Sequence, residues 1–176
     1  EYHNVVLQPS EQQKEIVASL SERAEKVRNK QVNSNEDNML VITNDGRKLA
    51  LDQRLINPML PDSDTGKVAV CTENVYKIWE RTAEKKSTQM VFVDLSTPHN
   101  DGQFNVYDDL KKKLLDKGIP ETEIAYIHDA KTEAAKKELF GKVRSGEIRV
   151  LIGSTQKMGA GTNAQRKLIA LHHMDC

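Results

Sequence analysis

The sequence predicts an α/β fold built around a parallel sheet. Three observations support this class. After residue 67, short apolar runs alternate with amphipathic stretches of helical spacing. The apolar runs are five to seven residues long and the helical stretches cover about three turns. The first run, QMVFVDL at 89–95, is almost continuously apolar, which is typical of a strand buried on both faces. Strands that alternate with helices form βαβ units, and those units make parallel sheets.

The elements of this α/β part follow from periodicity and from turn residues. A helix is expected over 67–85, because apolar residues recur there every three to four positions. Gly118 and Pro120 end a later helix. The full set of expected elements is a helix over 67–85, a strand over 89–95, a helix over 105–117, a strand over 123–127, a helix over 132–143, a strand over 148–153 and a strand over 168–172.

Residues 1–64 are expected to form a mainly helical connector, and residues 65–176 the α/β domain. Ser10 and Gln13 have the spacing of a capping box, which predicts a helix over 11–29. A short β-type run at 5–7 precedes it. Residues 38–56 fit either a hairpin with an Asp-Gly turn or two short helices, and the spacing of their leucines favours helices. A proline-containing loop follows.

Charge is balanced overall but uneven along the chain. The 176 residues contain 26 Lys and Arg and 26 Asp and Glu, for a net charge of zero. This balance argues against a polybasic nucleic-acid binder and against an acidic disordered tail. Residues 1–64 carry 8 basic and 11 acidic residues, whereas 131–176 carry 9 basic and 4 acidic, a net charge of +5. We therefore expect an anion-binding surface near the C-terminal end.

Cysteine usage and hydropathy bear on the compartment. The two cysteines, Cys71 and Cys176, are far apart and lack a CxxC partner, so neither a disulfide framework nor a zinc ribbon is expected. No stretch approaches the ~18–20 apolar residues of a membrane span. A cytoplasmic location without a membrane partner is the expectation. The chain begins at Glu1 and ends just after an apolar run, which suggests a piece of a longer protein.

Ligands of parallel sheets bind beyond the carboxyl ends of the strands. Three loops are expected there, at 95–104, 128–131 and 154–163. The last combines hydroxyls, Lys157 and two glycines, and such a loop can hold phosphate oxygens on backbone amides. A plain tight turn is the alternative. A dinucleotide-binding fingerprint is disfavoured, because five residues separate Gly153 from Gly159 and another strand follows too soon.

No metal site is expected. His172 and His173 are adjacent on a strand, so their side chains point to opposite faces and cannot easily chelate one ion, even with Cys176 nearby. Lys111, Lys112 and Lys113 are interpreted as a solvated helix face, and Trp79 as a core residue.

The order of these segments resembles the second RecA-like lobe of superfamily-two helicases, with the Swi/Snf-like translocase branch closest. QMVFVDLSTP resembles motif IV. The segment from EIAYIHDA to GSTQKMGAGTN resembles a strand, a helix and motif V, and LIALHHMDC the strand that follows. Five motif V positions match: Ser154, Thr155, Gly159, Gly161 and Asn163. The resemblance covers about residues 65–176.

The wider segment, including DNMLVITNDGRKLALDQRL, is similar to the helicase portion of very large bacterial mobile-element proteins labelled DNA methylases. The resemblance then implies that residues 1–64 join two lobes. It implies an ATP-driven motor on duplex DNA, whose partners are the DNA phosphate backbone, without sequence preference, and the first helicase lobe of the same parent chain. ATP with Mg²⁺ would be the cofactor of the complete parent only.

The resemblance also assigns site residues. It implies that Gly159, Gly161, Thr162 and Asn163 face the ATP cleft, and that the DNA contacts are Ser154, Thr155, Lys157, Ser96, Thr97, His128 and Asp129. Two departures from the family pattern concern these positions. Asp129 occupies the family's usual Gly position, and Lys157-Met158 replaces small residues of motif V.

Two motifs of a complete motor are not found. The sequence has no GxxxxGK[ST] Walker loop and no Gln-x-x-Gly-Arg-x-x-Arg motif VI. No catalytic residue is therefore assigned, and the chain alone is expected neither to hydrolyse ATP nor to move DNA. The alternatives are a non-catalytic DNA- or protein-binding scaffold with a degenerate helicase lobe, and a small stand-alone α/β nucleotide-binding enzyme.

Overall fold

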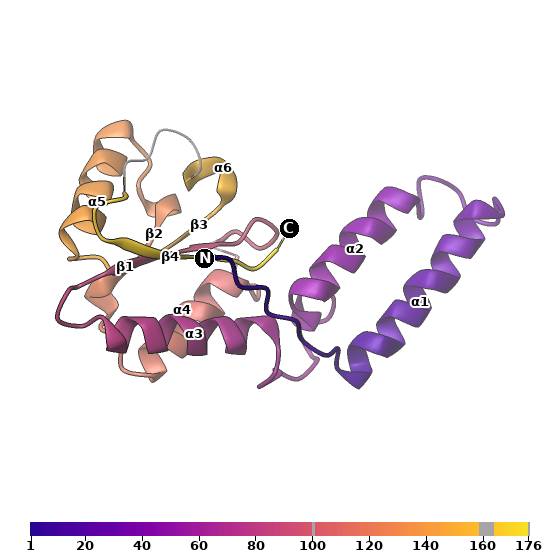
Figure 1. Ribbon diagram of the computed structural model, residues 1–176. Coiled ribbons are helices and arrows are strands. Elements are labelled where there is room, and N and C mark those ends of the chain that lie inside the picture. The colour runs from indigo at the N-terminus through magenta and orange to yellow at the C-terminus, as the bar shows by residue number, and fades with distance from the viewer. Residues whose placement is uncertain (100, 159–163, 176) are drawn as a thin grey trace. The chain divides into compact units, whose positions relative to one another are not determined.

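A computed structural model describes residues 1–99, 101–158 and 164–175, and it is an α/β structure with a four-stranded parallel sheet (Figure 1). The chain divides into two units, Glu1–Lys67 and Val68–Cys176. The boundary predicted from the sequence, between residues 64 and 65, lies three residues earlier. Among the described residues, no helix is both long enough and apolar enough to cross a membrane.

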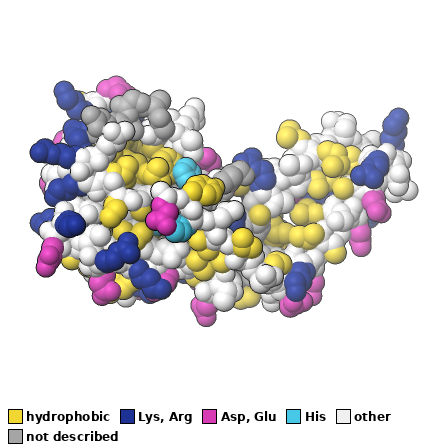
Figure 2. Space-filling view, in the orientation of Figure 1, with side chains coloured by type: hydrophobic (Ala, Val, Ile, Leu, Met, Phe, Trp, Pro, Cys, Tyr) yellow, Lys and Arg dark blue, Asp and Glu magenta, His cyan; other side chains and the backbone are white. Residues whose placement is uncertain are grey.

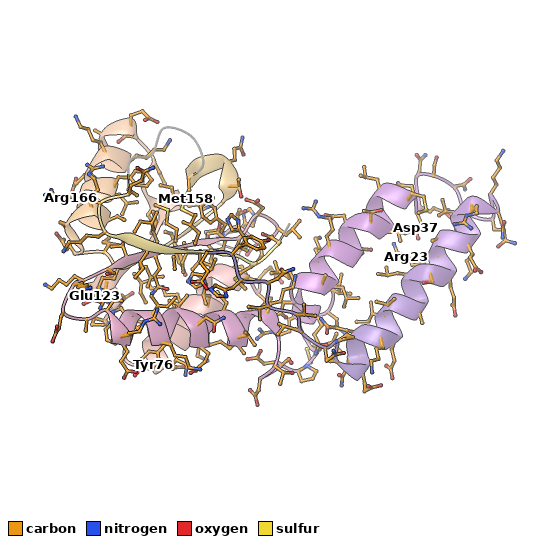
Figure 3. The ribbon with its side chains drawn as sticks, in the orientation of Figure 1. Arg23, Asp37, Tyr76, Glu123, Met158 and Arg166 are labelled. Carbon is orange, nitrogen blue, oxygen red and sulfur yellow. The ribbon has the colours of Figure 1, made fainter. Side chains whose placement is uncertain are left out.

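The first unit contains the helices α1 (Glu11–Arg28) and α2 (Met39–Leu51) and a short 3-10 helix, η1 (Gln53–Leu55). The predicted capping box starts α1: Ser10 Oγ accepts the Gln13 backbone N–H, and the Gln13 side chain accepts the Ser10 N–H. Two ion pairs tie the helices together, because Arg23 contacts Asp37 at 2.7 Å and Asp45 at 2.9 Å. Figure 3 shows Arg23 and Asp37 pointing toward each other.

Residues 38–56 are helical, so the helix alternative is correct and the hairpin is not. Asn38 caps α2 by accepting the Leu40 and Val41 N–H groups, and Ile42 and Leu49 are buried on one face. The Asp-Gly pair lies inside the helix instead of forming a turn. The apolar run at 5–7 was expected to be β-type, yet it forms no strand, since no neighbouring strand pairs with it.

The second unit contains all four strands. These are β1 (Thr88–Phe92), β2 (Ile124–Tyr126), β3 (Val150–Gly153) and β4 (Leu168–His173). Their order is β2-β3-β1-β4, and every pair is parallel. The α-helices described in this part are α3 (Lys67–Arg81), α4 (Val106–Asp116), α5 (Glu133–Ser145) and α6 (Thr155–Met158).

Helices cover both faces of the sheet (Figure 1). One face packs against α5 and α6 through a core that includes Met90, Phe92, Phe140 and Met158. The other face lies against α3 and α4. Every residue of β1 is buried, which confirms the prediction from its almost continuous apolar run. Every residue of β3 is buried too. The edge strand β4 is different: its exposure alternates along the strand.

Several details differ from the sequence expectations, and one is that the strand expected over 89–95 ends at Phe92. The strand expected over 123–127 ends at Tyr126 and continues as a 3-10 turn, η3 (Ile127–Asp129). The loop expected over 154–163 begins with the helical turn α6. Trp79 is half-buried and not in the core. Its indole N–H donates to Glu123 at 2.6 Å. In an apolar core the indole N–H would have no such acceptor.

Candidate functional site

The candidate site lies at the ends of two neighbouring strands. The chain leaves these two strands toward opposite faces of the sheet. After β1 the chain passes to α4, whereas after β3 it passes to α6 on the other face (Figure 1). Because β1 and β3 are adjacent and parallel, this is a topological switch point, the position at which open α/β sheets bind ligands.

Asp94 and Thr155 connect the two strand ends at the switch point. The Thr155 backbone N–H donates to Asp94 Oδ1 at 2.7 Å. Both side chains are exposed. The Thr155 hydroxyl makes no hydrogen bond to another described residue, so it can donate to or accept from a ligand.

A second carboxylate, that of Asp175 after β4, contacts the backbone at the end of β1. Its oxygens accept the Asp94 N–H at 2.9 and 3.0 Å and the Leu95 N–H at 2.7 Å. Successive backbone N–H groups in this arrangement form an anion-binding concavity. The Asp175 carboxylate occupies that concavity and holds the loop after β1 in place.

Tyr107 and His128 form the wall of the site beside β1. The Tyr107 hydroxyl is buried and donates to the Val93 carbonyl at 2.7 Å. His128 Nε2 lies 3.3 Å from the same hydroxyl oxygen. Because the hydroxyl has only one proton, the hydrogen-bond pattern assigns a proton to His128 Nε2, which then donates to Tyr107. In the neutral ring Nδ1 then carries no proton and can accept a hydrogen bond.

His128 contributes little positive charge near neutral pH. Its pKa is lowered, first by burial and then by the nearby Lys157, with Asp129 opposing the change. The imidazole is therefore uncharged at pH 7. Lys157 is exposed and supplies the positive charge near this histidine.

The two predicted serines have structural contacts. Ser96 is buried, and its Oγ accepts the Val106 N–H at the start of α4 at 2.8 Å. Ser154 is also buried, and its Oγ lies 3.4 Å from the Lys157 N–H, which donates to it. Thr97 is half-buried, and no described residue makes a hydrogen bond with its hydroxyl. Thr97 and Thr155 are therefore the hydroxyls best placed to meet a ligand.

The structure thus brings Thr155, Lys157, His128 and Asp129 to one end of the sheet, as the parallel arrangement predicts. The four positions assigned to the ATP cleft, Gly159, Gly161, Thr162 and Asn163, lie outside the described residues. Their assignment stays a prediction.

Sequence reasoning missed three residues of the site: Asp94, Tyr107 and Asp175. Asp94 directly follows the most apolar strand, and that position was the available signal. Asp175 lies two residues after β4. Its contact with Asp94 depends on β4 lying next to β1, and no local pattern reveals this adjacency.

No metal site is found in the described part of the second unit, where no three His, Cys, Asp or Glu side chains come close enough together to share an ion. His172 contacts Gln89, whereas His173 stacks on Phe92 with ring centroids 4.6 Å apart. The two imidazoles therefore lie on opposite faces of β4, as predicted.

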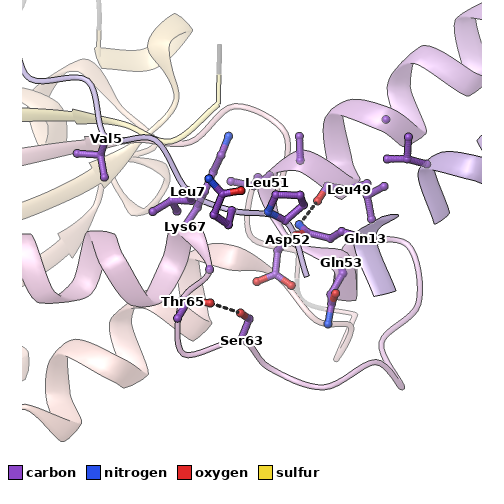
Figure 4. Close-up of a pocket in the computed structure, with 16 residues that line it drawn as sticks. Val5, Leu7, Gln13, Leu49, Leu51, Asp52, Gln53, Ser63, Thr65 and Lys67 are labelled. Carbon is purple, nitrogen blue, oxygen red and sulfur yellow. Dashed lines mark hydrogen bonds between the residues drawn. The ribbon is translucent and has the colours of Figure 1, made fainter. Parts of the chain in front are cut away.

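The first unit has a cavity of about 320 Å³ between its N-terminal segment, α1 and α2 (Figure 4). Val5, Leu7 and Leu51 supply part of its apolar lining. Two of the three glutamines that line it are already engaged, because Gln13 donates to the Leu49 carbonyl and Gln53 to the Pro61 carbonyl. Their hydrogen bonds hold the unit together, so the switch point is the stronger candidate site.

Comparisons with protein-family models, curated proteins and solved structures found no match to this chain.

Proposed function

We propose that the chain is the second, RecA-like lobe of an ATP-dependent DNA translocase of the helicase type and that it contributes contacts to the DNA backbone. One observation carries the proposal. Three loops that are distant in the sequence, those of Thr97, His128 and Thr155, follow neighbouring parallel strands of one sheet. The resemblance assigns DNA contacts to these same loops.

The chemistry of the site suits a phosphate backbone better than it suits bases. The Thr155 and Thr97 hydroxyls can donate to phosphate oxygens, and Lys157 adds a mobile cation. Contacts of this kind position a protein on DNA without reading its sequence. A motor that moves along DNA needs contacts that do not depend on sequence.

The described residues do not fit the ATP phosphates that the resemblance also implies. The Thr155 N–H, an amide that a phosphate could use, already donates to Asp94. No step through ATP is therefore assigned to these residues, and nucleotide hydrolysis is proposed only for the parent protein.

Duplex binding by the Thr155→Val/Lys157→Gln variant tests the proposal. Fluorescence anisotropy of a labelled duplex of arbitrary sequence, at low salt, measures the Kd. Loss of one hydroxyl contact and one cation is expected to weaken binding about tenfold and to reduce the salt dependence of log K by about one. The matched control is Gln156→Ala, which changes an exposed residue of α6 and is expected to bind like wild type.

Two results would contradict the proposal. If the double variant binds duplex as tightly as wild type, the switch point does not contact the backbone. If the purified chain turns over ATP, the stand-alone enzyme becomes the better account.

A further inference from the structure

A basic surface lies at the opposite end of the sheet from the candidate site. Lys85 and Lys86 precede β1, and Arg166 and Lys167 precede β4. Because β1 and β4 are parallel neighbours, the two turns lie together: the Thr88 N–H donates to the Lys167 carbonyl at 2.8 Å. We call these four cations the basic edge.

Gly146 shows how tightly the two turns pack. A Cβ atom at this glycine would lie 2.6 Å from the Lys86 carbonyl oxygen and 3.2 Å from Lys167 Cδ. Gly146 also has a φ of 81°, so it ends α5 in a left-handed conformation that glycine adopts readily. The close packing of the end of α5 fixes the positions from which the cations project.

The cations of the basic edge have no carboxylate partner among the described residues. Most other lysines of this unit differ in this respect. Lys111 pairs with Glu121 and Lys136 pairs with Glu133. The last turn of α5 also carries Lys142, which pairs with Glu138 at 3.1 Å, and Arg144. The acidic residues adjacent in sequence are Glu84 and Glu147, fewer than the cations.

The pictures agree with this distribution. Figure 2 shows Lys and Arg side chains gathered along the left side of this unit, where the strands begin in Figure 1. Figure 3 labels Arg166 on the same side. Unpaired cations at fixed positions attract a polyanion, and the attraction weakens with salt.

We propose that the basic edge is a second, independent contact for the phosphate backbone of duplex DNA. The cations lie on turns and not on a helix with an apolar face, which is the usual form of a membrane-surface element. The choice of DNA over other polyanions rests on the proposed function. The contact itself does not use Thr155, Lys157 or any other residue of the switch point.

The test compares two variants of the full chain with equal loss of charge. The first carries Lys85→Gln, Lys86→Asn, Arg166→Gln and Lys167→Gln. The control carries Lys26→Gln, Arg28→Gln, Lys30→Asn and Lys112→Gln, all at exposed sites. Lys30 and Lys86 both have positive φ, 55° and 48°, and asparagine tolerates that conformation. Far-ultraviolet circular dichroism and thermal unfolding check that both variants fold.

Anisotropy with a labelled duplex then measures K across a salt series. If the four cations neutralise phosphates, the slope of log K against log salt falls by about three to four in the basic-edge variant, and low-salt affinity falls by at least tenfold. The control variant is expected to keep most of the slope. Equal slopes for wild type and the basic-edge variant, or no duplex binding by wild type at low salt, would overturn the proposal.

The two proposals fail in different ways. If the Thr155→Val/Lys157→Gln variant binds duplex like wild type and the basic-edge variant binds it more weakly, the basic-edge contact is supported. The switch-point contact is then contradicted. The reverse result contradicts the basic-edge contact alone. Vesicles containing phosphatidylserine serve as the competing polyanion. Binding to vesicles without binding to duplex would show a membrane surface and overturn the inference.

Discussion

His172 shows how one half-buried side chain can make stability depend on pH. Its Nε2 lies 2.9 Å from Gln89 Oε1. Since the Gln89 amide donates to the Val75 carbonyl, the amide oxygen is the acceptor for His172. Burial, followed by the neighbouring His173, lowers the pKa of His172 to about 4.

The sign of the effect follows from this lowered pKa. Between pH 6.5 and pH 4 the unfolded chain binds more protons than the folded chain, so stability falls as pH falls through that window. We expect the second unit to lose roughly 1 to 2 kcal/mol between pH 7.5 and pH 5 through this histidine. Urea unfolding followed by Trp79 fluorescence measures the loss.

The variants separate His172 from other titrating groups. His172→Gln is expected to remove most of that pH dependence, whereas the exposed His99→Gln keeps it. An equal loss of stability on acidification in wild type and His172→Gln would show that the cause lies elsewhere.

Residue-level prediction from the sequence succeeded where the contact was local. The Ser10–Gln13 capping box spans three positions, and the opposite orientations of His172 and His173 follow from strand geometry alone. The Asp94–Asp175 contact joins residues 81 positions apart. It depends on strand order, which no local pattern encodes.

At the scale of elements, Gly153 sets how closely β3, η3 and α6 approach one another. A Cβ atom there would collide with the Ile127 side chain and lie 2.7 Å from Met158 Sδ. Gly153→Ala is therefore expected to destabilise the second unit by about 1 to 3 kcal/mol. It should also weaken duplex binding, because α6 carries Thr155 and Lys157.

Gly141→Ala in α5 is the matched control. Its nearest neighbour, Arg144 Nη2, is 3.8 Å away, and alanine favours a helix over glycine by about 1 kcal/mol. Urea unfolding should therefore show this control to be as stable as wild type or slightly more stable. A Gly153→Ala protein of wild-type stability would mean that the three elements can separate without cost.

Element prediction from the sequence was most accurate for buried strands and capped helices. The apolar runs of β1 and β3 were sufficient to predict these two strands, and the Ser10 cap was sufficient to predict the start of α1. The run at 5–7 failed because a strand needs a partner, and β propensity does not supply one. The helical turn α6 was missed because a four-residue helix is too short for periodicity.

At the scale of the whole chain, helix–strand alternation predicted a parallel sheet but not the order β2-β3-β1-β4. That order creates the switch point between β1 and β3, and it places the basic edge at the other end of the same sheet. The net charge of zero conceals this arrangement, because acidic residues of the first unit offset the basic residues of the second.

Photo-crosslinking from position 155 shows whether DNA reaches the carboxyl ends of the strands. In a Cys176→Ser background, Thr155→Cys is labelled with a thiol-reactive photocrosslinker and irradiated with duplex DNA. Cys71 is expected to stay unlabelled, because burial raises the pKa of its thiol to about 12 and keeps it protonated. The control is Lys112→Cys, an exposed site on α4. We expect a salt-sensitive DNA crosslink from position 155 that is stronger than any from position 112. Equal crosslinking from both positions, or none from position 155, would contradict a DNA-binding site at the carboxyl ends of the strands.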